Sequence, residues 1–163
     1  MTDLPRYLPA EAWPAYAYHP GRDPHPTRDP EGHLYGVPEN EDPAKPPENW
    51  SQSWRYLRGI DLYNHGYAWE AHEVWESMWL RPAEREQAEL LQALIQLAAA
   101  SVQQSVNRPD GRVRLCHRAL DHLRKVRAAG HRVYMGLELE TLRSVLIEYA
   151  ADPQARPVLR LNP

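Results

Sequence analysis

The sequence of 163 residues contains one cysteine, no phenylalanine and only two lysines. Cys116 has no partner for an internal disulfide, which excludes a disulfide-stabilised secreted scaffold, and we interpret it as a small buried hydrophobe. No apolar run approaches the about 18 residues that a membrane-spanning helix needs, and no basic stretch leads into an apolar signal region. We therefore expect a cytoplasmic protein.

Neither sign of charge dominates the chain. The formal net charge is −3 and the isoelectric point is about 6.2, which argues against a nucleic-acid or anionic-membrane surface, because such surfaces are usually basic. Hydrophobic residues make up 42% of the chain, enough for a globular core. The remaining partner classes are a small molecule or another protein.

The first part of the chain is rich in proline. Residues 1–49 hold 11 of the 16 prolines, and proline at this density disfavours both helices and central strands. The segment also carries scattered aromatic residues, which are scarce in solvated tails. We predict that residues 1–48 form an extended segment packed on a helical domain of residues 49–163, anchored by Trp13, Tyr16, Tyr18 and Tyr35.

The rest of the chain has a helical period. Apolar positions recur at spacings of three and four, and Gly, Pro and Asn clusters interrupt them. Short breaks between long helices favour antiparallel neighbours. We predict an all-α fold, an antiparallel bundle of about five helices without strands, with helices near residues 50–64, 67–80, 83–106, 113–129 and 138–149.

The second predicted helix is apolar on most of its sides, which is typical of a helix buried among several neighbours. At 100° per residue, Glu70, Glu73 and Ser77 fall in the sector that faces water, with Glu70 also suited to capping the start of the helix. His72 and Glu76 fall in a sector predicted to be interior. Any pocket here would be lined by Trp69, Trp75 and Trp79.

Polar residues on two other helices extend this pattern. Asp61 and Asn64 continue the inward stripe of the first helix, and Gln92 and Gln96 border the apolar stripe of the third. If these faces converge, the candidate polar cluster consists of Asp61, Asn64, Glu70, His72, Glu76, Gln92 and Gln96. Such a cluster would be a structural network, a ligand pocket, or a metal or hydrolytic site.

The metal hypothesis has weak support from spacing. A zincin motif needs a second histidine four residues after the first, but that position is Glu76. Three protein ligands are normally required for a catalytic zinc ion, and glutamines are poor ligands. We expect no cofactor; the alternative is that His72 and Glu76 bind a metal or act as acid and base.

Three histidines lie in the proline-rich segment. The spacing of His19, His25 and His33 matches no compact ligand motif, and Asp23 and Asp29 precede prolines, as in ordinary turns. We predict turn and packing roles for these five residues. A further hypothesis is that the segment folds over the His72 region and closes a pocket.

Two strings carry a resemblance to a known family. The string GYAWEAHEVWE at residues 66–76, with Trp79, and LQALIQLAAA at 91–100 resemble the prokaryotic domain-of-unknown-function family numbered 309. The resemblance covers roughly Trp54 to Leu123, and residues 25–33 look like the N-terminal extension of longer members. It implies a small all-helical bundle whose motif positions are Glu70, His72, Glu76, Gln92 and Gln96.

The family resemblance implies no activity. The residues themselves predict a helical domain with an interior polar cluster that binds a small ligand or a partner. The alternative is a metal-dependent or acid/base hydrolase-like enzyme that uses His72 and Glu76.

Overall fold

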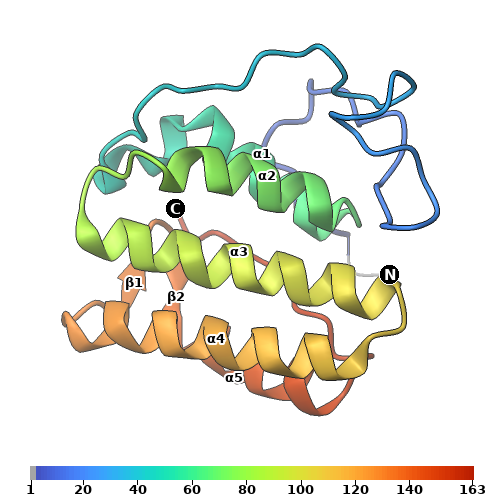
Figure 1. Cartoon of the computed structure of the whole chain (residues 1–163). Coiled ribbons are helices and arrows are strands. Elements are labelled where there is room, and N and C mark those ends of the chain that lie inside the picture. Colours follow the sequence, from blue (N-terminus) through green and yellow to red (C-terminus); the bar gives the residue numbers. More distant parts are fainter. Residues whose placement is uncertain (1–2) are drawn as a thin grey trace.

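The structure is a computed structural model that describes residues 3–163. Its helices contact one another in chain order, and α3 lies between the α1–α2 pair and the α4–α5 pair (Figure 1). The predicted all-α bundle is confirmed. The elements are the 3-10 helix η1 (Pro47–Gln52), α1 (Trp54–Asn64), α2 (Ala68–Trp79), α3 (Arg85–Ser105), α4 (Pro109–Ala128), β1 (Val133–Tyr134), β2 (Leu137–Glu138) and α5 (Leu139–Ala151).

The first helix begins later than predicted. Residues 47–52 form η1, and Ser53 then adopts an extended conformation before α1. The Ser53 side chain accepts a hydrogen bond from the Tyr56 amide at 3.4 Å, so it caps α1. Trp54 therefore occupies the first turn and is 46% exposed.

The core lies along α3, where the predicted stripe is confirmed. Leu91, Leu94, Ile95 and Ala98 are buried between the neighbouring helices. The next helix begins earlier than the turn signal suggested, because Pro109 occupies its first position, where its missing amide costs no hydrogen bond. Cys116, on α4, is buried as predicted, and burial raises the pKa of its thiol to about 11.

A small hairpin was not predicted. β1 and β2 pair antiparallel through a turn in which Met135 and Gly136 have φ of +47° and +79°. Two successive residues with positive φ are typical of the tight turns that join such strands. The strands are only two residues long, so no alternating pattern reveals them. The hairpin packs on the bundle, since the Tyr56 hydroxyl donates to the Met135 carbonyl at 2.8 Å.

Residues 3–46, which we call the arm, run along the outside of α1 and α2, where Figure 1 draws them in blue. The Ala44 amide donates to the Arg81 carbonyl at 2.9 Å, just before η1 begins. Tyr7, Leu8 and Trp13 pack against the core cluster. Among the described residues, no helix combines the length and apolarity needed to span a membrane.

Candidate functional site

Asp61 fastens the start of the arm to α1. Its carboxylate is fully buried, and its two oxygens accept hydrogen bonds from the backbone amides of Tyr7 and Leu8, each at 2.8 Å. A buried carboxylate costs free energy unless both oxygens are satisfied, and here the arm supplies the donors. Asp61 thus has a structural partner.

Asn64, one turn further along α1, holds the C-terminal segment. Its side-chain amide donates to the Leu159 carbonyl, and its side-chain oxygen accepts from the Leu159 amide, both at 2.8 Å. The two ends of the chain also meet, because the Leu161 amide donates to the Tyr7 hydroxyl at 2.7 Å. Asn64 therefore fixes the position of the C-terminal segment and does not face a cavity.

Glu70 is buried, so its prediction as a solvent-facing cap was wrong. One carboxylate oxygen accepts from the Tyr18 amide at 2.9 Å and lies 2.8 Å from the imidazole Nε2 of His33. Both partners come from the arm, which covers this side of α2 and excludes water. The sequence offered no periodic signal for this cover, because the arm has no regular secondary structure.

The other arm histidine contacts are local or aromatic. His19 and Asp23 lie 3.0 Å apart within one turn, and the pKa of Asp23 is lowered chiefly by the backbone amide of His19. His25 packs edge-on against Trp69. These are the turn and packing contacts that the sequence predicted.

His72 and Glu76 are not interior, so that prediction was wrong. Their side chains are 26% and 43% exposed, and the His72 Nδ1 lies 3.6 Å from the Glu76 carboxylate and 3.3 Å from that of Glu73. The buried face of α2 instead contains Ala71, Trp75 and Met78. Because a helix packed mainly against α1 and α3 keeps one sector open, His72, Glu73 and Glu76 reach solvent together.

Gln92 and Gln96 hydrogen-bond each other on α3. The Gln96 amide donates to the Gln92 side-chain oxygen at 3.1 Å, and both residues are half-buried. In the described part of the chain, no hydrogen bond joins them to His72 or Glu76. The hypothesis that the polar faces of three helices converge in one hydrogen-bonded network is therefore replaced by separate contacts.

The three tryptophans of α2 have different environments. Trp75 is fully buried, and its indole N–H donates to the Tyr56 carbonyl at 3.4 Å. Trp69 packs edge-on against Tyr18, and Trp79 packs, half-buried, on the core. These contacts are structural, and the tryptophan that lines the pocket between the arm and the α1–α2 pair is Trp54 instead.

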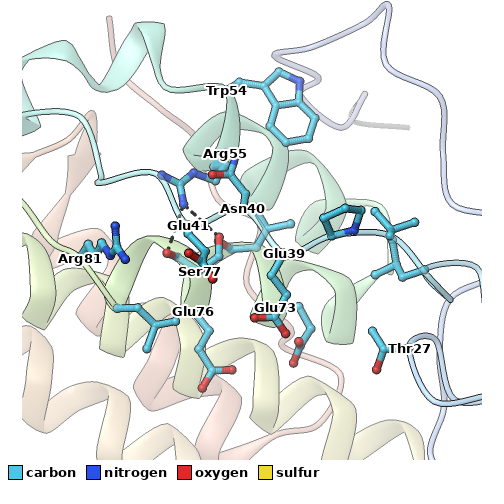
Figure 2. A pocket seen from close by; sticks show the side chains of 15 residues that line it. Thr27, Glu39, Asn40, Glu41, Trp54, Arg55, Glu73, Glu76, Ser77 and Arg81 are labelled. Atoms are coloured by element: carbon cyan, nitrogen blue, oxygen red, sulfur yellow. Dashed lines mark hydrogen bonds between the residues drawn. The ribbon is translucent and has the colours of Figure 1, made fainter.

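That pocket, which we call the arm groove, has a volume of about 620 Å³ between the arm and the α1–α2 pair (Figure 2). Arg55 reaches Ser77 at one side of it, whereas Glu73 and Glu76 lie lower in the view. The walls combine apolar and acidic side chains. They consist of Thr27, Leu34, Val37, Pro38, Glu39, Asn40, Glu41, Trp54, Arg55, Glu73, Val74, Glu76, Ser77, Leu80 and Arg81.

Only Glu76 of the predicted site residues lines the arm groove. The arm wall could not be found from sequence, because it depends on which way an irregular segment crosses the helices. Glu73 was assigned to the solvent sector, which is correct, but its role in a pocket was missed. The only signal was that it neighbours His72 and Glu76 on one helix.

The comparison with protein families gives one result for this chain. Residues 56–115 match the model of a domain of unknown function (DUF309). The chain contains a DUF309 domain. The expected family resemblance is thus confirmed, and the match includes all seven members of the candidate polar cluster. No curated protein matches the chain. The DUF309 domain supplies the α2 wall of the arm groove, whereas the arm wall and Trp54 lie outside the matched residues.

Proposed function

We propose that this protein is a binding domain whose arm groove takes a small organic ligand. The observation that carries the proposal is the groove itself, at about 620 Å³. Pockets of roughly 300–1,000 Å³ with mostly apolar walls and a few polar groups are the usual size and character of small-molecule sites.

Exposed apolar side chains support the same proposal. Val37, Trp54 and Leu80 are 56%, 46% and 66% exposed, and all three line the arm groove. The three residues come from different segments: Val37 from the arm, Trp54 from α1 and Leu80 from the end of α2. Apolar surface gathered in one place favours an occupant, since its burial contributes about 25 cal/mol per Å².

A pair of matched variants tests this function. A neutral apolar probe such as 3-phenylpropanol should bind the wild-type protein and broaden or shift the indole N–H signal of Trp54 in NMR spectra. Leu80→Glu should weaken that binding at least fivefold, because it places a charge on the apolar wall. Val158→Glu is the control, because Val158 is also an exposed apolar residue but lies outside the groove. Equal binding by both variants would contradict the proposal.

A second candidate function is a metal-dependent or acid/base hydrolase-like activity. The observation that favours it is that one ligand atom each of His72, Glu73 and Glu76 lie within 4.8 Å of one another. A catalytic zinc ion normally has three protein ligands, and imidazole and carboxylate groups both bind zinc; Glu73 is added here to the pair expected from sequence. Without a metal, His72 would serve as a base and a carboxylate as an acid.

Calorimetric titration with Zn²⁺ and Mn²⁺ tests the metal. The second candidate predicts one ion per chain, with binding lost in His72→Ala and kept in His117→Ala, a control at an exposed histidine of α4. Binding that survives His72→Ala, or no binding at all, would contradict a metal site at these residues.

A further inference from the structure

The charged side chains of the arm groove are unevenly divided between the two signs. Four carboxylates line it, Glu39 and Glu41 from the arm and Glu73 and Glu76 from α2, against two guanidinium groups, Arg55 and Arg81. Acidic side chains therefore belong to both walls, so an occupant between the walls would meet carboxylates on two sides.

Arg55 does not offer its donors to an occupant. One terminal nitrogen donates to the carbonyl and hydroxyl oxygens of Ser77 at 3.1 and 3.3 Å. The other donates to the carbonyls of Asp42 and Pro43 at 2.6 and 3.1 Å. These bonds fasten the end of the arm to α2, and they leave no free terminal nitrogen for the carboxylate of a ligand.

In contrast to the Arg55 guanidinium, the two α2 carboxylates remain accessible from the groove. Glu73 and Glu76 are one turn apart, with side chains 40% and 43% exposed, and their carboxylates lie 3.3 and 3.6 Å from the His72 imidazole. In the described residues, no Lys or Arg forms an ion pair with either of them or with Glu39 or Glu41. Their charges therefore remain available to a cation in the groove.

We infer that the ligand of the arm groove is a small organic cation, an ammonium or guanidinium group on an apolar body. The inference rests on the proposed ligand-binding function and names its chemical class. The apolar body would cover Val37, Trp54 and Leu80, and the cationic group would lie toward the carboxylates of Glu73 and Glu76. The same carboxylates would repel an anionic ligand of equal size.

Three compounds with one apolar body test the charge. They are 3-phenylpropylammonium, the neutral 3-phenylpropanol and the anionic 3-phenylpropanoate, titrated into the full-length protein at low salt and followed by NMR. We expect the ammonium compound to bind about 2- to 30-fold more tightly than the alcohol, as two exposed ion pairs would give, and the carboxylate to bind most weakly. Added salt should reduce the difference.

Single substitutions show which carboxylates cause the preference for the ammonium compound. Glu73→Gln and Glu76→Gln should each reduce the preference for the ammonium compound over the alcohol. Glu148→Gln, at an exposed glutamate of α5, is the matched control and should change neither. Glutamine keeps the size and helical fit of glutamate, so folding is little affected.

The outcomes separate the inference from the proposed function. Equal binding of all three compounds, or tightest binding of the anion, would contradict the inference that the ligand is a cation. Either result would still support the proposed ligand site. No binding of any compound would overturn both. Binding of a lysine-rich peptide without binding of the ammonium compound would overturn the small molecule in favour of a peptide. A preference that survives both glutamine variants would also overturn the inference.

Discussion

The Glu70 carboxylate on α2 and the His33 imidazole in the arm lie 2.8 Å apart, with both side chains almost fully buried. The two residues are 37 positions apart in the sequence. Their contact fixes the arm between Thr27 and Leu34, two residues that line the arm groove. The integrity of the groove thus depends on a buried polar pair outside it.

Breaking this pair should loosen the arm. Glu70→Ala removes the acceptor of both His33 and the Tyr18 amide, and buried groups left without partners cost about 1–3 kcal/mol of unfolding free energy. Denaturant unfolding measures the loss, and limited proteolysis should show faster cleavage within the arm. Glu148→Ala should change neither. A Glu70→Ala variant as stable and as resistant as the wild type would contradict this role.

Removal of residues 1–48 should leave a folded helical domain, because the α-helices begin at Trp54 and the buried core cluster, apart from Ala44, lies beyond this segment. The truncated protein should keep its helical circular dichroism, bind more of an apolar dye, and lose solubility where Tyr7, Leu8 and Trp13 no longer cover the core. Loss of the helical signal would show that the arm is integral to folding, and that the division at residue 48 is wrong.

Trp75 should be the most sensitive position of α2. It is fully buried and lies so close to Gly59 of α1 that an added Cβ there would come within 2.1 Å of the indole nitrogen. Trp75→Ala should therefore lower the unfolding free energy by about 3–5 kcal/mol. A thermal midpoint unchanged by the substitution would remove the argument that α2 is buried on this face.

His72 and Glu76 should tolerate substitution. Since both are partly exposed, His72→Leu and Glu76→Met should each change the unfolding free energy by no more than about 0.5 kcal/mol, with a coupling of similar size or less. A double-mutant cycle in denaturant melts measures this. A coupling of about 1–3 kcal/mol would instead assign the pair to a structural network.

Glu89 should make stability depend on pH. Burial raises the pKa of Glu89, but hydrogen bonds from His122 and Lys125 lower it more, so its pKa in the folded protein is below the ordinary 4.5. A lowered pKa gives stabilisation that is present above the ordinary value and lost as pH falls through the folded value. Glu89→Gln should thus destabilise the protein at pH 7, and the difference should shrink as the pH falls below the ordinary pKa of 4.5. A difference independent of pH would contradict the shift.

The sequence predicts the helices well because their periodicity is local. The α3 stripe follows from spacing alone, and the family resemblance is confirmed over residues 56–115. The hairpin was missed because two-residue strands have no period. The angular position of His72 on the helix also gave a wrong prediction of burial. A sector next to the apolar face of a helix is buried only if another element covers it.

The candidate site was harder to predict because it forms between distant segments. Asp61, Asn64 and Glu70 are buried, and their partners are Tyr7, Leu159 and His33, far away in the chain. Their pairing depends on the path of two irregular terminal segments, which have no periodic pattern. The hypothesis that the arm closes a pocket near His72 was therefore open from sequence alone.

The most direct measurement of the central claim is crystallography of the full-length protein soaked with a chemically diverse set of small fragments. The account predicts that fragments gather in the arm groove against Val37, Trp54 and Leu80, and that those with a cationic group place it toward Glu73 and Glu76. The claim that this groove is a ligand site would be contradicted if fragments bound only at other sites. It would also be contradicted if no fragment bound in the groove although the groove was open to solvent in the crystal.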